Sequence, residues 1–364
     1  MISSQRIRKI ALVSLLLLIS SQGQALDFNG GFTVLGQSAS DARIDNDITA
    51  SVDLGMSWNR PNGRWYLYLE ANNTPKNTGV ATLLIESNAD AGTALDKDRD
   101  GRLQISELNY QFKFSNDSLL TVGMLDASAY IDQSRITNDE NIQFLGVSFV
   151  NNPSIEFPDY ALGVVQEIKP QKNSMISLVV SSSNGLSDNT NVSYSQLVNI
   201  DEADKGFFLA AQYLIESGRT NLATGFWTHT APHESLDGLS TNAKNYGYYA
   251  VAGWKQKKHA LNARMSVANQ EVMSAHIFGS LAYRYKSGDW VFAVGSSKIM
   301  LSDKAVQVDQ DDTIQSEMYL RYELQSGLYL TGSLQHLINS GFDASNSDYD
   351  DRVYVSTVRL TYEL

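Results

Sequence analysis

A run of alternating carboxylates in the first third of the chain has the spacing of a calcium-binding loop. Carboxylates occupy positions 1, 3, 5 and 12 of a twelve-residue stretch, and a glycine stands at position 6, where such loops turn sharply. A main-chain carbonyl supplies the ligand at position 7. The predicted ligands are Asp96, Asp98, Asp100, the carbonyl of Arg102, and Glu107. The match predicts an EF-hand-like calcium loop inserted at residues 94–108, and a solvated acidic turn is the alternative.

The segments beside this loop differ from those of a paired calcium sensor. Residues 88–93 have loop composition, and residues 107–114 alternate apolar and polar as a strand does. Because a sensor needs a helix on each side of the loop, we expect a solitary site that fastens a long connection to the wall of the protein.

The histidines give little support for catalysis or zinc binding. His229 and His233 are four residues apart, but the sequence indicates no third ligand, so zinc is not expected. The other three, His259, His276 and His336, form no pattern with a serine that would suggest a nucleophile and its base. No phosphate loop or dinucleotide fingerprint occurs. The sequence therefore predicts a protein that is not an enzyme.

Alternation with a period of two runs through most of the chain and defines the elements that carry these residues. From Ile48 to Trp58 every second residue forms one largely apolar face that ends in an aromatic ring. Similar segments recur near 28–36, 48–58, 64–72, 104–114, 119–125, 161–169, 174–182, 206–216, 220–228, 246–255, 259–268, 274–286, 289–299, 315–324, 328–338 and 352–364. The pattern predicts an all-β fold of sixteen antiparallel strands.

The connections between these segments alternate between short polar turns and long loops. Ser287-Gly288 is a typical short turn, whereas residues 37–47, 73–103, 126–160 and 183–205 are long. An even number of strands with short turns at one rim and long loops at the other is the layout of a transmembrane β-barrel of the outer membrane. A secreted β-sandwich or propeller is the alternative. Against it, aromatic residues cluster at strand ends, as in the girdles of membrane barrels. They are Trp58, Trp65, Tyr66, Trp227, Trp254, Trp290 and Tyr362.

The first 25 residues have the layout of a secretory signal peptide. Arg6, Arg8 and Lys9 precede an apolar run from residue 10 to residue 19, and Gly23-Gln24-Ala25 resembles a cleavage site. The run is too short to cross a bilayer as a helix. Residues 26–364 are therefore expected to form the barrel in the outer membrane of a Gram-negative-type bacterium, in contact with its lipid. A net charge of -12 excludes nucleic acid as a partner, and the chain has no cysteine.

The third long connection, residues 126–160, is expected to form a constriction loop. Thr137 and Glu140 make a capping box, so we predict a helix that begins there and ends before Asn151, Asn152 and Pro153, after roughly three turns. A polar-rimmed segment with a buried apolar stripe needs a protected place to dock. We predict that it folds into the barrel mouth and narrows it; a cap over the rim is the alternative.

Four arginines on the late strands alternate away from the apolar face and are predicted to line the pore. A charge on the lipid face costs about 2–4 kcal/mol near the midplane, which favours the inward direction. These arginines are Arg264, Arg284, Arg321 and Arg359. The constriction loop is predicted to oppose them with Asp132, Asp139, Glu140, Glu156 and Asp159, with Arg135 among these acids. Guanidinium groups facing carboxylates match sugar hydroxyls. The alternative is that each arginine is a structural partner of a wall carboxylate such as Glu323 or Glu363.

Several of these stretches resemble the OprB family of carbohydrate-selective porins. They are 122–126 (VGMLD), 138–144 (NDENIQF), 149–153 (FVNNP), 157–160 (FPDY), 334–339 (LQHLIN) and the single Arg359 of the last strand. The resemblance covers roughly 104–169 and 315–364, and the terminal Leu364 departs from the Phe or Trp usual at that position. It implies a sixteen-stranded channel for passive diffusion of small carbohydrates. An anion-preferring porin for acidic oligosaccharides and a non-conducting surface or adhesion barrel stay open, as does assembly into a homotrimer.

Overall fold

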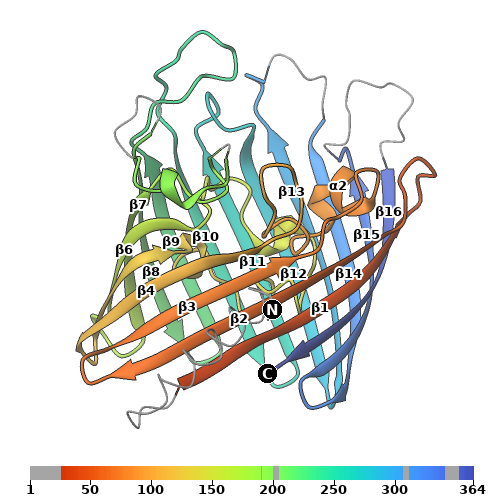
Figure 1. Ribbon diagram of the computed structural model, residues 1–364, viewed down its shortest axis with the longest axis horizontal. Coiled ribbons are helices and arrows are strands. Elements are labelled where there is room, and N and C mark those ends of the chain that lie inside the picture. Colours follow the sequence, from red (N-terminus) through yellow and green to blue (C-terminus); the bar gives the residue numbers. More distant parts are fainter. Residues whose placement is uncertain (1–25, 190, 200–204, 306–310, 341–351) are drawn as a thin grey trace, which may run out of the picture.

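The chain forms a closed antiparallel barrel (Figure 1). The computed structural model describes residues 26–189, 191–199, 205–305, 311–340 and 352–364, and the predicted signal peptide lies outside these ranges. In this described part, each strand pairs with its sequence neighbours, and β1 closes the barrel on β16 with Gly31 opposite Glu363. The strands are β1 (Leu26–Ala39), β2 (Asp47–Arg60), β3 (Gly63–Asn72), β4 (Leu103–Ser115), β5 (Ser118–Leu125), β6 (Ala161–Ile168), β7 (Ser174–Ser182), β8 (Phe207–Ser217), β9 (Thr220–His229), β10 (Tyr246–Gln256), β11 (His259–Ala268), β12 (Ala275–Ser287), β13 (Trp290–Leu301), β14 (Thr313–Gln325), β15 (Leu328–Ile338) and β16 (Arg352–Glu363). The predicted sixteen-stranded fold is confirmed.

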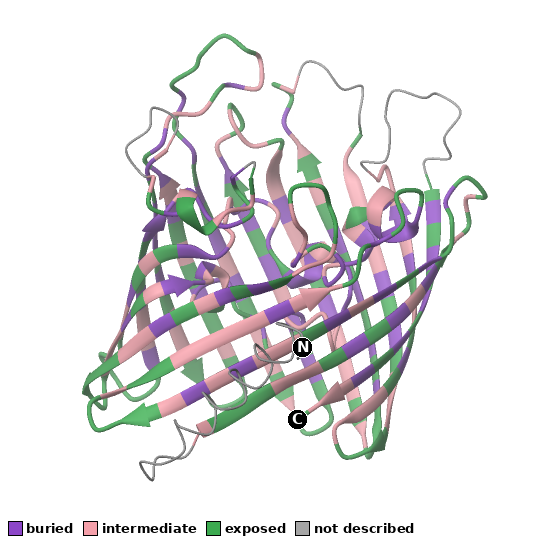
Figure 2. Cartoon of the chain, viewed as in Figure 1, coloured by how far each residue is buried: buried purple, intermediate pink, exposed green. Residues whose placement is uncertain are grey.

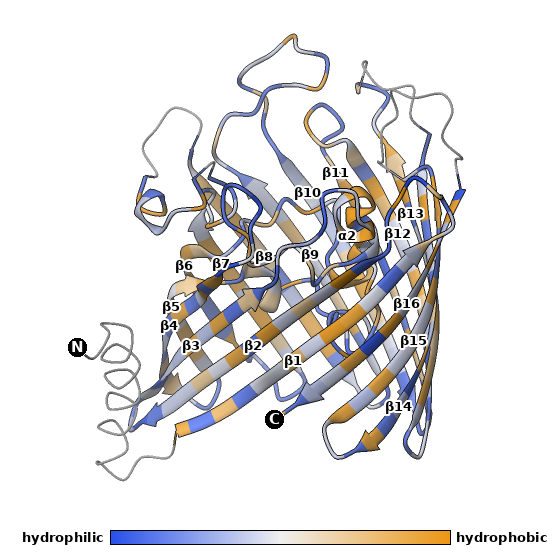
Figure 3. Ribbon diagram, turned by 45° about the vertical axis from the view of Figure 1, so that its right-hand side comes forward, coloured by the Kyte–Doolittle hydropathy of each residue, from blue (hydrophilic) through white to orange (hydrophobic). Residues whose placement is uncertain are grey.

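The strands carry their apolar residues on the outside. On β2, Ile48 and Val52 are 68% and 51% exposed, whereas Thr49 and Ser51 are buried. Figures 2 and 3 show the same alternation of exposure and hydropathy along β1 and β2. A sandwich would bury the apolar face and expose the polar one. The opposite arrangement is that of a barrel whose outer surface contacts hydrocarbon.

Aromatic rings cluster on the outer face near the short turns. Trp65 lies between Trp58 and Tyr110, with ring centroids 5.9 and 4.9 Å away, and Trp290 lies 4.5 Å from Tyr322. The predicted outward positions of Trp58, Trp65 and Trp290 are thus confirmed. Tyr66 was predicted to join them, but it pairs with the buried Ser57 and stacks on Tyr68, and so faces the inside of the barrel.

The assignment of Trp227 to this set is wrong. Trp227 is fully buried on the inner face of β9, where its ring stacks on Phe208 with a centroid distance of 6.3 Å. A large aromatic ring can fill space against an inner segment as well as anchor an interface, and residue type alone does not distinguish the two.

The helices of the described residues are short and lie in the long connections. They are α2 (Val80–Leu83), η2 (Ile85–Ser87), η3 (Ala127–Ala129), α3 (Val147–Val150) and η4 (Tyr194–Gln196). None of them is long and apolar enough to cross a membrane.

The predicted helix beginning at Thr137 is wrong, because only its last turn forms. The Asp139 carboxylate accepts hydrogen bonds from the main-chain N–H groups of Asn141 and Ile142, which makes a turn in place of a helix start. The extended Gly146 then precedes α3. The N–H groups of Leu145 and Gly146 bind the carboxylate of Glu317 on β14, so a partner outside the loop satisfies them.

Candidate functional site

Residues 126–160, called here the inner loop, pack against the inside of the barrel wall. Figure 1 draws this segment in yellow across the barrel interior. Phe144 stacks on Phe149 with centroids 4.6 Å apart and meets Tyr319 of β14 edge-on at 5.1 Å. A Cβ atom at Gly295 of β13 would lie 2.7 Å from Phe149, so glycine makes room for the ring. The cluster consists of Ile136, Phe144, Phe149, Ala260, Ala282, Val291, Ala293 and Tyr319.

A second apolar cluster fixes both ends of the inner loop to the opposite side of the wall. It joins loop residues to strands β5 to β11 through buried rings and aliphatic side chains. Its loop members are Ala127, Ile131 and Ile155, and its wall members include Phe208, Trp227, Tyr249 and Val251. Burial of these side chains supplies the free energy that holds the segment inside.

Three of the four predicted arginines bind the main chain of the inner loop. Arg359 donates to the carbonyl oxygens of Glu140 and of Gln143, the latter at 2.7 Å. Arg264 donates to the Phe149 carbonyl at 2.8 Å, and Arg321 donates to the Ile142 carbonyl. Arg264 and Arg359 are only 3% and 1% exposed. Their inward direction agrees with the prediction, but the expectation that these two line open pore is wrong, because the loop covers them.

The other two predicted arginines are placed differently. Arg284 is half-buried on β12, paired across the sheet with Ala260 and Ala293. Arg135 of the inner loop forms an exposed ion pair with Glu216 at the end of β8. Arg284 is within electrostatic range of Tyr319 and Arg321 on the same wall, whereas Arg135 is paired with Glu216.

The predicted acids of the inner loop take separate roles. Asp132 lies 3.7 Å from the buried guanidinium of Arg264, so it is a structural partner and does not line the pore. Asp139 closes the local turn described above. Glu140 lines the main cavity, and burial raises the pKa of its carboxyl well above the usual range.

Sequence reasoning missed a second inner segment. Val80 and Leu84, in and beside α2, are buried against Leu337 of β15 and Val353 of β16. The carbonyl of Ser87 accepts a hydrogen bond of 2.8 Å from Gln335, and the N–H of Ala89 donates to the Leu145 carbonyl at 2.9 Å. The only signal was the apolar run near Val80, which is too short for a strand or helix assignment. Two connections therefore fill the barrel interior together.

A cavity of about 430 Å³ lies between the inner loop and strands β3 and β4. Carboxylates dominate its polar lining, and aromatic rings stand beside them. The carboxylates are Glu70, Glu107, Asp126, Glu140 and Asp159, and the rings are Tyr68, Phe157 and Tyr160. Burial raises the pKa of Asp159 to about 7, since the charged form loses water. The open space is thus acidic on both the wall and the loop.

Tyr68 lines both this cavity and a smaller one of about 100 Å³ near the short-turn rim. Glu140 lines the larger cavity and its neighbour Asn141 lines the smaller one. The side chain of Asn141 donates to Asp53 at 2.9 Å and accepts from Thr33 at 2.6 Å. The two cavities are therefore separated by Tyr68 and by a loop tip that is held to the wall.

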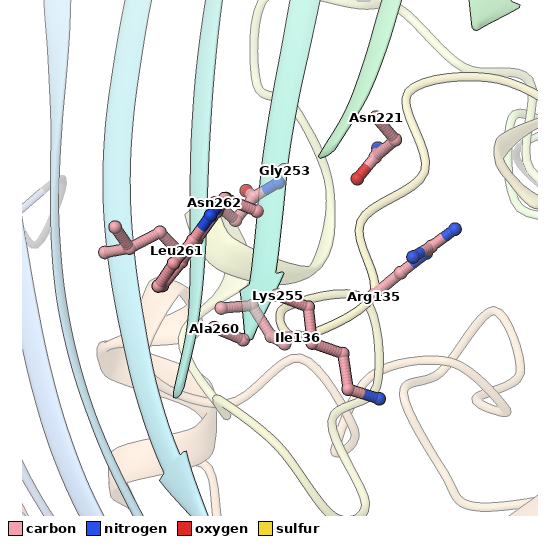
Figure 4. Close-up of a pocket in the computed structure, with 9 residues that line it drawn as sticks. Arg135, Ile136, Asn221, Gly253, Lys255, Ala260, Leu261 and Asn262 are labelled. Carbon is pink, nitrogen blue, oxygen red and sulfur yellow. The ribbon is translucent and has the colours of Figure 1, made fainter. Parts of the chain in front are cut away.

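The opposite side of the inner loop leaves almost no space. Figure 4 shows Arg135 and Ile136 of the loop beside Lys255, Ala260 and Asn262 of β10 and β11. The hollow among them measures about 10 Å³, which holds one water molecule but no sugar.

The structure does not bring the five predicted calcium ligands together. The Asp96 carboxylate accepts hydrogen bonds from the N–H groups of Asp98 and Asp100, at 2.9 and 3.0 Å. The carbonyl of Arg102 instead accepts from Asn72, at 3.4 Å. Glu107 is on β4 and contacts the N–H of Asp126 inside the barrel. Among the described residues, the group with three metal-ligating side chains close together is instead Glu156, His229 and His233.

The fold is similar to that of several solved porins. The chain is similar to OprB of Pseudomonas putida, with a TM-score of 0.72 and 10% identity over 97% of this chain and 96% of that one. It is also similar to a mutant of the Rh. blastica porin, with a TM-score of 0.55 and 13% identity over 93% of this chain and all of that one. A loop-deletion mutant of OmpT from Vibrio cholerae gives a TM-score of 0.58 at 10% identity, over 94% of this chain. No protein-family model and no curated protein matches the sequence.

Proposed function

We propose that this protein is an outer-membrane channel for the passive diffusion of small neutral carbohydrates. The observation that carries the proposal is the cavity of about 430 Å³ with its carboxylates and rings. We propose that the solute passes from it beside Tyr68 into the smaller cavity near the short-turn rim, which Tyr68 also lines. The outward apolar face supports contact with lipid. The similarity to OprB is consistent with sugar as the solute.

The lining offers the chemistry that a sugar needs without a strong site. Carboxylate oxygens accept hydrogen bonds from sugar hydroxyls, and the ring faces of Tyr68 and Phe157 can stack on the apolar faces of a pyranose. No catalytic step is proposed, since passage requires only that binding be weak enough for release.

The rival anion-preferring channel depended on a strip of exposed arginines. Arg264, Arg321 and Arg359 are engaged by loop carbonyls, and the open cavity is lined by carboxylates. We therefore expect a preference for neutral solutes and cations over anions. The second rival, a non-conducting surface barrel, predicts no ion current at all.

Planar-bilayer recording and liposome swelling test the proposal together. We expect ion conductance, partial block by added neutral sugar, and swelling that is faster with glucose than with glucuronate. Absence of conductance would favour the surface barrel, and faster entry of glucuronate would favour the anion channel.

A substitution at the narrow passage identifies the route. Tyr68→Ala should raise conductance and weaken block by sugar roughly fivefold, since one lost ring contact is worth about 1 kcal/mol. Tyr213→Ala, an exposed tyrosine of β8, is the matched control. Equal sugar block in the wild type and in Tyr68→Ala would place the solute path elsewhere.

Calcium binding at residues 96–107 stays a prediction, but only the three aspartates remain as side-chain ligands. Asp96, Asp98 and Asp100 share one turn, whereas Glu107 faces the inside of the barrel. Calcium titration of Asp98→Asn beside the wild type measures this directly, and repeating the swelling assay with a chelator shows whether permeation depends on it. Assembly into a homotrimer is equally a prediction, which the mass of the detergent-solubilised protein tests.

A further inference from the structure

Two histidines and one glutamate from different parts of the chain meet above the second apolar cluster. His229 ends β9, His233 lies in the connection that follows, and Glu156 belongs to the inner loop. Their ligand atoms lie within 4.8 Å of one another. The Glu156 carboxylate is 3.0 Å from Nε2 of His233 and 3.6 Å from Nε2 of His229. The sequence concealed this third ligand because Glu156 lies 73 residues before His229.

The hydrogen bonds of His233 leave one nitrogen directed at the carboxylate. Its Nδ1 is 3.1 Å from the Ala231 carbonyl, an oxygen that can only accept, so Nδ1 carries a proton. Nε2 then faces Glu156, which in its ionised form also only accepts. A cation must stand between two such lone pairs, and it is either a second proton on the ring or a metal ion.

Two of the three side chains of this triad, Glu156 and His233, have partners outside it that orient them. The Asn245 side-chain amide donates to Glu156 and holds the carboxylate in place, while its own Oδ1 is buried without a partner among the described residues. His229 is buried with its ring 5.2 Å from Phe208 and 6.0 Å from Trp227. Partners that orient the ligands, together with a dry apolar wall, strengthen binding of a cation by neutral imidazole and carboxylate.

We propose that Glu156, His229 and His233 bind a divalent transition-metal ion such as Zn²⁺. Two imidazole nitrogens and one carboxylate oxygen are a ligand set that zinc accepts, with a fourth position for water or for Oδ1 of Asn245. Nε2 of His229 gives up its 2.7 Å contact with the Glu156 carbonyl on binding, and its ring proton then sits on Nδ1. The ion joins the end of the inner loop to β9 and to the connection after it. This inference is independent of which solute the channel passes.

Metal titration of untagged, metal-stripped protein in detergent tests the site. Calorimetry with Zn²⁺ should give one saturable site per chain when excess Ca²⁺ is present to occupy the aspartate turn. Co²⁺ should give the visible absorption bands of a low-coordinate ion with nitrogen ligands, and Cu²⁺ should quench the fluorescence of Trp227, whose ring is 6.0 Å from His229.

Two ligand variants and one control make the result specific. Glu156→Gln and His233→Gln should each weaken Zn²⁺ binding at least tenfold, the loss that even supporting partners of metal ligands show. In Glu156→Gln the new amide oxygen can still accept from Asn245, so the fold is expected to persist. His259→Gln is the control, because His259 is hydrogen-bonded to Tyr283 and is not part of the triad. This variant should keep the wild-type affinity for Zn²⁺.

Two outcomes overturn the proposal. Absence of saturable Zn²⁺ binding by the wild type would show that a proton occupies the position and that the triad is an ion pair. Zn²⁺ binding of wild-type strength in both ligand variants would place the ion elsewhere in the protein.

Discussion

The two sides of the barrel interior use inward polar residues in opposite ways. On the arginine wall, strands β11 to β16, Arg264, Arg321 and Arg359 bind the inner loop and aromatic rings pack against it. On the acidic wall, strands β3 and β4, Glu70 and Glu107 face a cavity of about 430 Å³. Strand alternation points side chains inward on both walls, but the docked loop decides which of them meet solvent.

Two kinds of contact attach the inner loop to the arginine wall. The phenylalanine cluster provides buried area, and the guanidinium groups satisfy loop carbonyls that no helix satisfies. Since three arginines reach main-chain oxygens, the loop sequence can vary at those points while the bonds persist. On the acidic wall, the N–H of Asp126 at the start of the loop donates to Glu107, whereas the cavity of about 430 Å³ lies between the loop and strands β3 and β4. The proposed solute path runs through this cavity.

Removal of a buried aromatic ring of the inner loop should have the largest effect on stability and conductance. Phe149→Ala empties the contact with Phe144 and Gly295 and should lower the free energy of unfolding by about 3–5 kcal/mol. With the loop loosened from the arginine wall, conductance should rise and fluctuate. Urea unfolding in detergent and single-channel recording measure both effects.

Phe112→Ala is the control for this substitution, because Phe112 is exposed on the outer face of β4. Its conductance should equal that of the wild type. If Phe149→Ala conducts as the wild type does, the aromatic cluster does not determine the width of the channel.

Replacement of a covered arginine should have the next largest effect. Arg359→Met keeps much of the side-chain length but leaves two carbonyls of the loop without donors, which should cost about 3 kcal/mol. The half-buried Arg284 provides the comparison, and Arg284→Met should change stability by less than about 1 kcal/mol. Equal losses in the two variants would remove the distinction between covered and uncovered arginines.

The sequence predicted the barrel well because strand alternation is a local property. Ile48 and Val52 are assigned to the outer face by spacing alone, and sixteen segments with alternating connection lengths allow one arrangement. The helix at Thr137 failed for the opposite reason. Glu317 on β14 binds the N–H groups of Leu145 and Gly146, and no local pattern announces that partner.

The candidate site was predicted only in part for the same physical reason. Parity placed Arg264 and Arg359 inside, yet their exposure depends on contacts with residues more than a hundred positions away. Glu70 of β3 also falls on the inward face by strand alternation, but it was not predicted as a site residue because none of the predicted arginines lies on β3. Tertiary packing determines which inward residues contact water. The spacing of residues in the sequence does not predict this.

Release of the loop tip tests the boundary between the two walls. Asn141 bonds to Thr33 and Asp53 beside the narrow passage, so Asn141→Ala should cost about 1–2 kcal/mol and increase open-channel noise without detaching the loop. Asn173→Ala, at an exposed turn where the side chain bonds to the Glu216 carbonyl, is the control. Quiet channels in Asn141→Ala would mean that the arginines alone hold the tip.

The smallest expected effect is a dependence of ion selectivity on pH at the acidic wall. The pKa of the Asp159 carboxyl is raised by burial to about 7, so the group is neutral in mildly acidic solution and charged above neutrality. Cation preference should therefore increase as the pH rises from about 5 to about 8. One added charge about 4 Å from a solute ion is worth about 1 kcal/mol in water, or roughly a fivefold change in selectivity.

Stability should change in the opposite direction over the same range. Because folding favours the neutral carboxyl of Asp159, its contribution to stability is full below the unfolded pKa and is lost as the pH rises through about 7. Asp159→Asn should keep a low cation preference at every pH and flatten both profiles. A pH-dependent reversal potential that survives in Asp159→Asn would assign the titration to another acid of the cavity, and a flat wild-type profile would show that the acidic wall does not set the selectivity.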